Sequence, residues 1–310
     1  MNNQNLDAHR FVNESVAVIK NQVGNECVLG AVSGGIDSTV AAILAYRAIR
    51  DQLSLIFLDD GLMRDRDRKD VENIFSSVSI SVEIMDVRER FFQNLKGAIH
   101  HDEKRKIFQK VFYETLGEIA IAKGTSLLLH GTILTDVEEV ERGIKRQHNP
   151  NIDPKEYGFQ GKLEPLITLR KDGVREVAKA LGLPNHIVYR KPFPGPGFLV
   201  RMLGELTPEK AEILRKASPI VEEEFDSLEP FQVFPVVIGQ ATGIRNDKPY
   251  YGYVLGIRCV KSVDARKAQT IEVGWSLLKK VDSRILEEIP EVIMVCYCLS
   301  DKPPATIEFE

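Results

Sequence analysis

The sequence predicts an α/β protein with a parallel sheet, followed by a smaller α+β domain. Short apolar runs typical of strands alternate with amphipathic helical segments through the first half of the 310-residue chain. This β-α-β-α order favours a parallel sheet with helices on both faces. A glycine-rich turn follows the first strand, at the carboxyl edge where such sheets bind ligands. A segment rich in proline and glycine indicates where the first domain ends.

The four strand-like runs of the first domain lie at 27–32, 53–58, 82–87 and 126–130. The helical patterns between them carry apolar residues on one face and lie at 37–50, 66–75 and 102–122. A further helix is expected over 171–181, because Gly182-Leu183-Pro184 stops it there. Between 132 and 162 the periodicity is lost, and we expect a long, charged, functional loop.

The domain boundary is expected at 191–197, which contains three prolines and two glycines and suits neither helix nor strand. The predicted domains are therefore 1–190 and 191–310. A helix over 207–225 is expected to open the second domain, because a threonine caps it and a proline occupies its first turn. The other expected elements of this domain are strands at 233–238, 253–260 and 291–299 and a helix at 275–288.

The composition disfavours several classes of protein. A hydrophobic content of 43% and a formal net charge of −4 are typical of a globular protein without the basic excess that attracts nucleic acid or anionic membranes. No apolar run approaches the ~18 residues of a membrane span, and residues 1–10 lack the apolar segment of a signal peptide. We therefore expect a cytoplasmic protein that acts on small molecules and binds neither nucleic acid nor membrane.

The most informative segment is Ser33-Gly34-Gly35-Ile36-Asp37-Ser38-Thr39, between the first strand and the first helix. Its glycines let the backbone approach an anion, and the positive end of the following helix points to the same place. The segment lacks the lysine of a Walker loop and the three spaced glycines of a dinucleotide fingerprint. It predicts a site for the pyrophosphate part of a nucleotide, although alone it is also compatible with a plain strand-to-helix turn.

This segment, with its strand and helix, resembles the pyrophosphate loop of the ATP pyrophosphatases, which cleave ATP between the α- and β-phosphates and adenylate a substrate oxygen. Further motifs make the chain similar to the ATP-pyrophosphatase subunits of GMP synthetases. They are Asp59-Asp60-Gly61-Leu62-Met63-Arg64, Glu103-Lys104-Arg105-Lys106, Gly131-Thr132, Lys191-Pro192-Phe193-Pro194-Gly195-Pro196-Gly197 with Arg201, and Lys302-Pro303-Pro304-Ala305-Thr306-Ile307-Glu308. The resemblance implies a Rossmann-like ATP-pyrophosphatase domain of the adenine nucleotide alpha hydrolase type, with a smaller C-terminal α+β dimerisation domain.

The resemblance also implies an activity, that of a ligase that forms a carbon–nitrogen bond. ATP would adenylate the C2 oxygen of XMP, and ammonia would then displace AMP to give GMP. Backbone N–H groups, Mg²⁺ and cations would meet the charge that builds on the departing pyrophosphate. Because we find no glutaminase segment in the chain, the two-subunit form implies a separate glutamine amidotransferase partner that supplies ammonia, and a homodimer formed through the C-terminal domain.

The expected ATP-binding residues are those of the loop, Ser33 to Thr39, together with Val32, Leu58 and Gly131 at the strand ends, where adenine would lie. Asp37 is the nearest carboxylate and the candidate for a catalytic role linked to Mg²⁺, with the Ser38 hydroxyl beside it. Lys145, in the charged loop, would close over the phosphates. The alternatives are a solvated surface lysine and ordinary sheet core for the apolar residues.

The resemblance assigns the nucleoside monophosphate to the C-terminal domain, and it carries over to Arg201, Lys302, Thr306 and Glu308. A dianionic phosphate is bound by arginine or lysine together with hydroxyl and backbone donors. Arg258, on a predicted strand, is a further candidate, with a surface salt bridge as its alternative role. A C-terminal edge strand over 305–309 is compatible with the same function.

The sequence departs from the family near the expected substrate. Arg146 and Gln147 replace a serine and a histidine, Gln109 stands where glycine is common, and 265–270 lacks the family's Met-Thr-Ala. Because these changes alter charge and hydrogen-bond geometry, two alternatives stay open. One is a related enzyme that adenylates a different acceptor for amination or thiolation. The other is a nucleotide-binding protein without turnover, which would not require the hydroxyls and the carboxylate of the loop.

Overall fold

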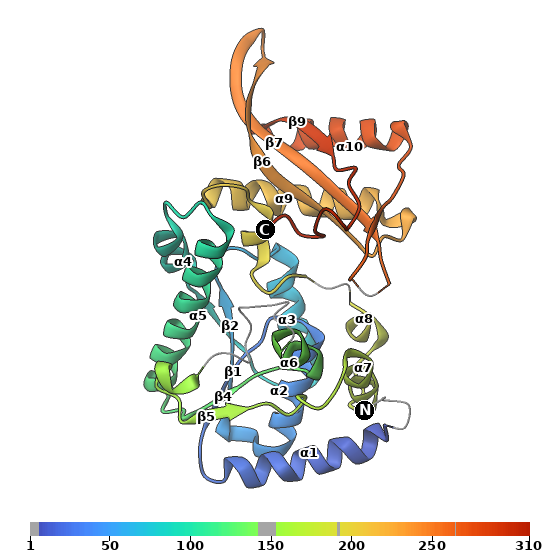
Figure 1. Cartoon of the computed structure of the whole chain (residues 1–310). Helices are drawn as coiled ribbons and strands as arrows, with labels where there is room; N and C mark the ends of the chain where they lie inside the picture. Colours follow the sequence, from blue (N-terminus) through green and yellow to red (C-terminus); the bar gives the residue numbers. More distant parts are fainter. Residues whose placement is uncertain (1–5, 142–152, 191–192, 264) are drawn as a thin grey trace. The chain divides into compact units, whose positions relative to one another are not determined.

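The structure is a computed structural model that describes residues 6–141, 153–190, 193–263 and 265–310 (Figure 1). The chain forms two compact units, and each is described by itself. Unit 1 comprises Met1–Asp59, Arg66–Val87 and Gln109–Arg190. Unit 2 comprises Asp60–Asp65, Arg88–Phe108 and Lys191–Glu310. The chain passes from unit 1 to unit 2 at residue 190 and at other points, so the domains 1–190 and 191–310 stay a prediction.

Residues 60–65 belong to unit 2 because they pack against the segment after the proline-rich turn. The N–H of Phe198 donates to the carbonyl of Leu62 at 2.7 Å. Gly197 has a φ of +59°, and a Cβ at this position would lie 2.2 Å from the same carbonyl oxygen. Only glycine therefore permits this contact.

Unit 1 is built on a parallel five-stranded sheet with the order β3-β2-β1-β4-β5. Its strands are β1 (Val28–Ala31), β2 (Leu53–Asp59), β3 (Glu83–Asp86), β4 (Leu127–Leu129) and β5 (Gly161–Leu163). The four predicted strands are confirmed, and so is the α/β class. The order of the strands reverses at β1, which lies between β2 and β4, so the crevice for a ligand is expected beyond the end of β1.

The helices of unit 1 are α1 (Ala8–Val23), α2 (Ile36–Ile49), α3 (Asp65–Ser77), α6 (Leu134–Glu141), α7 (Lys171–Ala180), α8 (Asn185–Val188) and most of α5 (His101–Lys123), with short 3-10 turns η2 (Arg50–Gln52) and η4 (Pro154–Tyr157). The four predicted helices are confirmed. Helix α1 was not predicted, although Asp7 caps it by accepting from the N–H of Arg10 at 3.0 Å.

The expectation of one continuous loop over 132–162 is wrong. Helix α6, the turn η4 and strand β5 all lie in this range. Helix α6 begins where it does because the carboxylate of Asp136 accepts from the N–H of Ile133 at 3.1 Å, which satisfies a donor at the start of the helix. Charge along this stretch hides the local capping signal.

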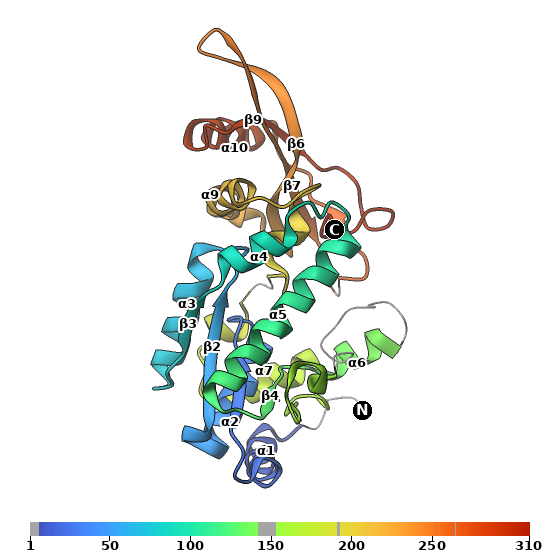
Figure 2. The same ribbon diagram turned by 90° about the vertical axis from the view of Figure 1, so that its left-hand side faces the viewer.

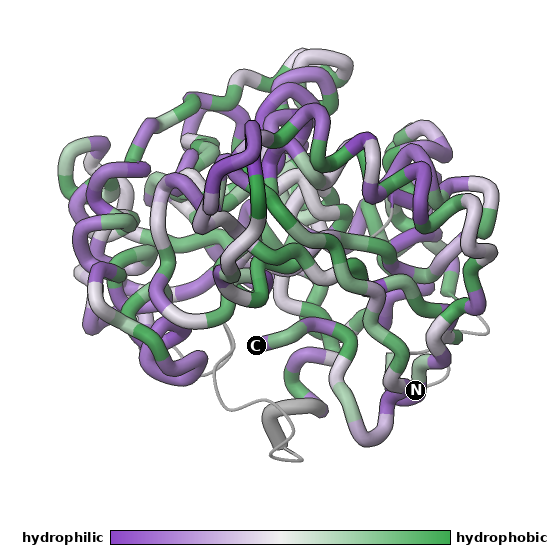
Figure 3. Tube along the Cα trace, turned by 90° about the horizontal axis from the view of Figure 1, so that it is seen from above, coloured by the Kyte–Doolittle hydropathy of each residue, from purple (hydrophilic) through white to green (hydrophobic). Residues whose placement is uncertain are grey.

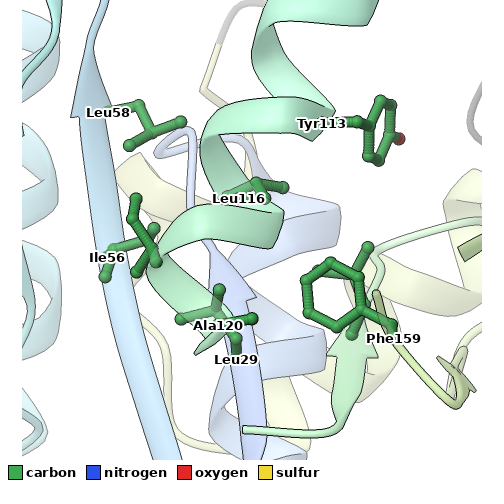
Figure 4. Packing of buried hydrophobic residues seen from close by; sticks show 9 residues of the cluster. Leu29, Ile56, Leu58, Tyr113, Leu116, Ala120 and Phe159 are labelled. Carbon is green, nitrogen blue, oxygen red and sulfur yellow. The ribbon is translucent and has the colours of Figure 1, made fainter. Parts of the chain in front are cut away.

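The core of unit 1 lies between the sheet and α5 (Figure 4). Leu29 and Ile56 are fully buried and pack against Leu116 and Ala120 of α5, while Phe159 closes one side of the cluster. Helix α2 packs against α1 and α7 and is apolar around most of its surface. A helix of this kind is held by burial on all sides, so the position of its N-terminus is set by the core.

Unit 2 contains a four-stranded sheet in which β6 (Gln232–Arg245) and β7 (Lys248–Lys261) form a long antiparallel hairpin. Strand β9 (Val292–Tyr297) pairs in parallel with β7, and β8 (Gln269–Thr270) is antiparallel to it. Figure 2 shows the tip of the hairpin extending past its neighbours. The predicted strands at 233–238 and 253–260 are confirmed, but they are only the buried halves of β6 and β7.

The helical elements of unit 2 are α4 (Arg88–Leu95), η5 (Gly197–Arg201), α9 (Pro208–Glu224), η6 (Asp226–Leu228), α10 (Trp275–Glu288) and the first turns of α5. Helix α9 packs against β6, and α10 packs against α9 and β9. The predicted helices at 207–225 and 275–288 are confirmed. The predicted cap is also present, since Thr207 Oγ1 accepts from the N–H of Lys210 at 3.2 Å.

Hydrophobic and hydrophilic residues alternate over short stretches of the chain (Figure 3). Within the described ranges, none of the helices has the length and apolar character needed to span a bilayer.

Candidate active site

The glycine-rich loop joins β1 to α2 at the carboxyl edge of the parallel sheet. Gly34 has a φ of +72°, in the left-handed region that favours glycine, and Gly35 is extended and caps α2. The first N–H groups of α2 have no preceding helical turn to supply carbonyl partners, so they point out of the helix end. This geometry is that of an anion site at a helix N-terminus.

Serine hydroxyls hold the shape of the loop. The Ser38 hydroxyl donates to the carbonyl of Gly35 at 3.0 Å and accepts from the N–H of Ser33 at 3.3 Å. The Ser33 hydroxyl lies 3.2 Å from that of Ser38 and accepts from the N–H of Gly35 at 3.3 Å. The two serines predicted for the site are therefore brought together across the loop, where they stabilise its conformation.

Asp37 carries a carboxylate at the same helix end. Its Oδ2 accepts from Nζ of Lys171 at 2.6 Å, whereas its Oδ1 is buried and has no hydrogen-bond partner. Burial raises the pKa of Asp37, and the charge of Lys171 opposes this shift. A carboxylate oxygen that is buried without a partner lacks a cation or a donor, and it is aimed at the region of the helix end.

The donor set around Asp37 fits Mg²⁺. Mg²⁺ in nucleotide sites is held by one or two carboxylates together with phosphate oxygens. Asp136 is close enough for its charge to raise the pKa of Asp37 further. Within the described residues, no group of three or more His, Cys, Asp or Glu side chains is placed to hold a metal ion. Phosphate oxygens of a bound nucleotide would therefore have to complete the coordination of a metal at Asp37.

Gly131 brings the end of β4 against the start of α2. A Cβ at this position would lie 2.8 Å from the backbone nitrogen of Ser38 and 2.9 Å from the carbonyl carbon of Asp37. The next residue, Thr132, is buried and donates from its hydroxyl to the Glu164 carboxylate at 2.6 Å. Gly131 is thus in direct backbone contact with the turn that carries Asp37.

Val32 and Leu58 are both buried, but they occupy different surroundings. The N–H of Val32 donates to the carbonyl of Ile56 at 2.9 Å, which continues the pairing of β1 with β2. Leu58 belongs to the core cluster beneath α5. In this register, alternation of side chains puts Val32 and Leu58 on opposite faces of the sheet. Their role in adenine binding stays a prediction, and it requires contact at the strand ends.

Two charged residues at this site were not predicted from the sequence. Lys171 starts α7 and pairs with Asp37. Arg190 donates from Nη1 to the carbonyl of Gly34 at 2.9 Å and pairs through Nη2 with Asp67 and Asp70, at 2.5 and 2.8 Å. Arg190 therefore ties the loop to α3. The partners are more than a hundred residues apart in the chain, so no local pattern could indicate these contacts.

His130 is a further buried polar residue at the end of β4. Burial and the charge of Lys162 lower the pKa of His130 to about 3, so the ring is neutral at physiological pH. Its Nδ1 is buried without a hydrogen-bond partner. The ring lies 5.8 Å from that of Tyr113, between their centroids. His130 therefore adds no positive charge beside Gly131.

Lys145 lies outside the described residues, as do Arg146 and Gln147, so their predicted roles stay predictions. Gln109, which also departs from the family pattern, is half-buried on α5.

Unit 2 brings together several residues predicted for the monophosphate substrate. The guanidinium of Arg201 is buried and donates from Nε and Nη2 to the two carboxylate oxygens of Glu308, at 3.0 and 2.9 Å. The rings of Phe193 and Phe234 lie 4.9 and 3.9 Å from the guanidinium carbon. Arg201 is therefore paired within the protein, and it orients the carboxylate of Glu308.

Arg258 does not form a surface salt bridge, so that alternative is wrong. Its side chain is only 2% exposed. It donates to the backbone carbonyls of Ser300 and Thr306 and to the hydroxyl of Thr270. Arg258 therefore anchors the segment that carries the other predicted substrate residues.

The suggested edge strand over 305–309 is also wrong, since no strand forms there. Arg258 takes the carbonyl of Thr306 at 3.0 Å, and the Thr306 hydroxyl donates to the carbonyl of Glu308, so these acceptors are not arranged as a ladder. The backbone of Lys302 pairs with that of Ala268 as an isolated bridge. Its Nζ donates to the carbonyl of Ala265 at 2.9 Å.

Replacing Gly131 with alanine is expected to displace the first turn of α2, because the new methyl group meets backbone atoms rather than a flexible side chain. We expect a loss of about 1–3 kcal/mol in the free energy of unfolding, and weaker binding of ATP, measured by denaturant titration and calorimetry. Gly161→Ala is the matched control, because its nearest neighbour would be a leucine methyl at 3.6 Å. Equal ATP affinities of the two variants would contradict the role given to Gly131.

Comparison with known proteins agrees with this architecture. A family model described as GMP synthase C terminal domain matches residues 222–309, and one described as NAD synthase matches residues 8–119. A protein of Archaeoglobus fulgidus named as a subunit of glutamine-hydrolyzing GMP synthase is 41% identical over 305 residues, which cover 98% of this chain and 100% of that protein.

Proteins of the same name from Methanopyrus kandleri and Methanocaldococcus jannaschii are 42% identical over 314 residues and 43% identical over 312 residues. Each of these matches also covers 98% of this chain and 100% of the relative. The relatives confirm the enzyme class predicted from the motifs, and this chain belongs to their family, the synthase subunits of two-subunit, glutamine-hydrolysing GMP synthases.

Proposed function

We propose that this chain uses ATP to adenylate the C2 oxygen of XMP and then replaces AMP by ammonia to give GMP. The observation that carries the proposal is the loop of unit 1, in which Asp37 presents an unpartnered buried oxygen beside the free amides of a helix N-terminus. The relatives that match the whole chain are named GMP synthases, which supports XMP as the acceptor. Pyrophosphate and AMP are the other two products.

The loop residues would bind and orient the pyrophosphate part of ATP. The first N–H groups of α2 and the extended backbone of Gly35 donate to phosphate oxygens. The XMP oxygen attacks the α-phosphorus, the bond to the bridging oxygen of the β-phosphate breaks, and its electron pair leaves with pyrophosphate. These fixed donors meet the charge that develops on the leaving group. The ammonium of Lys171 is 43% exposed and adds a cation beside them.

Asp37, with Asp136 nearby, would hold Mg²⁺, which supplies further neutralisation of phosphate charge when bound. Lys171 and Asp37 form an ion pair at 2.6 Å in this structure, so the ammonium also keeps the carboxylate turned toward the loop.

For XMP we propose the segment that carries Arg201, Lys302, Thr306 and Glu308. The Glu308 carboxylate is fixed in two hydrogen bonds by Arg201 and remains partly exposed, so it can accept from N–H groups of the base. Lys302 adds a cation and Thr306 a hydroxyl for the phosphate, and Arg258 anchors the segment. Because Lys302 and Thr306 also donate to backbone carbonyls, substrate would have to compete for these donors.

A separate glutamine amidotransferase subunit would supply the ammonia. The relatives are named as subunits of glutamine-hydrolyzing enzymes, which supports such a partner. The second step then consumes ammonia at C2 and releases AMP. The proposed location of the enzyme is the cytoplasm, as its role in nucleotide synthesis suggests.

The direct test is synthesis of GMP by the purified chain from XMP, ATP, Mg²⁺ and a high concentration of ammonium. We expect GMP, AMP and pyrophosphate in equal amounts, measured by chromatography. IMP, which lacks the C2 oxygen, is the matched control and should release no pyrophosphate. Glutamine in place of ammonium should give no GMP until the amidotransferase subunit is added.

The two alternatives give different results in this assay. Pyrophosphate release that depends on another carbonyl acceptor, but not on XMP, would identify a related adenylating enzyme. Binding of ATP without any release of pyrophosphate would indicate a nucleotide-binding protein.

A second prediction concerns Asp37→Asn, which retains the size of the side chain and removes its charge. We expect the turnover number to fall about 10²–10³-fold, as for the loss of one electrostatic contact to a transition state. Stability should change by less than about 1 kcal/mol, because burial disfavours the charged form and Lys171 is exposed enough to be solvated. Turnover and thermal unfolding measured side by side test this. Activity near that of the wild type would remove Asp37 from the mechanism.

We further propose that the chain forms a homodimer through the hairpin of unit 2. Thr242 pairs with Tyr251, and Ile244 pairs with Pro249, so alternation puts Ile244 and Tyr251 on the same face of the hairpin. Ile244 is 82% exposed and Tyr251 is 63% exposed. Large apolar side chains that share one exposed face support an interface with another protein surface.

Sedimentation equilibrium tests the dimer. We expect the wild-type chain to be dimeric and Ile244→Asp to shift the equilibrium toward monomer, because a charge would be buried on association. Val263→Asp is the control, since Val263 is 99% exposed in the same unit and lies outside the hairpin. A monomeric wild type would refute the dimer, and a dimer unchanged by Ile244→Asp would refute the hairpin as its interface.

A further inference from the structure

A lysine that the reaction does not use is buried in unit 2. Lys104, in the first turns of α5, has a side-chain exposure of 0%. Its Nζ donates to the carbonyls of Met202 and Gly204, at 2.8 and 3.1 Å, and pairs with the Glu310 carboxylate. An ammonium has three donors, so these three partners satisfy it. Burial lowers the pKa of Lys104, and Glu310 opposes this shift.

Glu310 is held by its backbone as well as by its side chain. Its N–H donates to the carbonyl of Val200 at 3.2 Å, and its carbonyl accepts from Nη2 of Arg105. Its carboxylate is only 9% exposed and faces Lys104. Two consecutive residues of one helix, Lys104 and Arg105, therefore clamp the same residue.

The clamp joins the two segments that form the proposed XMP site. One segment carries Arg201, and the carbonyls of Met202 and Gly204 that follow it bind Lys104. The other segment carries Glu308, two residues before Glu310. Between them, Arg201 and Glu308 form the bidentate pair. Lys104 is thus bonded to both sides of that pair without lying in it.

A second lysine reinforces one side of the clamp. Nζ of Lys210 donates to the carbonyls of Leu203 and Glu205, at 3.1 and 2.6 Å. Two ammonium groups therefore bind four consecutive backbone carbonyls, from 202 to 205. The segment after Arg201 is held along its length, so its position relative to Glu310 depends on where Lys104 is fixed.

We propose that Lys104 is a positioning residue for XMP binding, which acts through Glu310 on the Arg201–Glu308 pair. This inference rests on the proposed function only in taking residues 302–308 as part of the XMP site. A buried ion pair is not required for stability, because well-packed apolar residues of similar volume often do as well. Its use here is geometric: the clamp fixes the distance between the two segments that orient the Glu308 carboxylate.

The test compares Lys104→Met, Glu310→Gln and the double variant Lys104→Met/Glu310→Gln with the wild type. We expect the Kd of XMP, measured by calorimetry, to rise about ten- to a hundredfold in all three, because small displacements of a binding group carry losses of this order. The KM for ATP should change less than about twofold. The double variant leaves no unpaired buried charge, so its thermal midpoint should recover toward that of the wild type while its XMP affinity does not.

Lys110→Met is the matched control, because Lys110 lies on the same helix and is 69% exposed. It should alter neither ligand. If Lys104→Met does not fold, Glu310→Gln and the double variant still decide the matter. XMP affinity that recovers together with stability in the double variant, or equal losses for XMP and ATP, would overturn the inference. A wild type that neither binds XMP nor forms GMP would instead refute the proposed function.

Discussion

The contact between Gly131 and the first turn of α2 is the constraint on which the nucleotide site depends. Parallel pairing of β1 with β4 puts the end of one strand beside the loop that leaves the other. The two backbones then meet so closely that a Cβ at Gly131 would lie 2.8 Å from the nitrogen of Ser38. Since α2 is buried along most of its length, the helix cannot move away to relieve such a contact. The amides and the carboxylate of its first turn are therefore held in one place.

Charged side chains are used differently in the two units. In unit 1, Asp37 is only half satisfied, because Lys171 binds one oxygen and the other is buried without a partner. An incomplete pair of this kind is costly unless a ligand completes it. In unit 2, Arg201 and Lys104 have their charges paired with Glu308 and Glu310. The first arrangement suits a site that receives a cation and phosphate, and the second suits a framework that orients a carboxylate for a substrate.

Much of the fold could be predicted from the sequence, because its elements carry their own signals. The buried strands of unit 1 are apolar runs bounded by polar residues, and α9 has both its threonine cap and its proline. The signals that were missed are weaker. Helix α6 and strand β5 lie in a charged stretch, and α1 carries a narrow apolar stripe of Val12, Ile19 and Val23. The tips of β6 and β7 are exposed, so they show no alternation that would extend the predicted strands.

The sequence by itself determined the chemical character of the nucleotide site and the family, because the loop, its glycines and the flanking motifs are contiguous in the chain. The tertiary structure decided which charges meet. Arg190 reaches Gly34 across 156 residues, Lys171 reaches Asp37 across 134, and Arg105 reaches Glu310 across 205. Such contacts follow from strand order and helix packing, which bring distant segments together, and no local pattern of residues encodes them. For the same reason, Arg258 resembled a surface residue on its strand, and only the fold showed that it anchors the segment carrying Thr306.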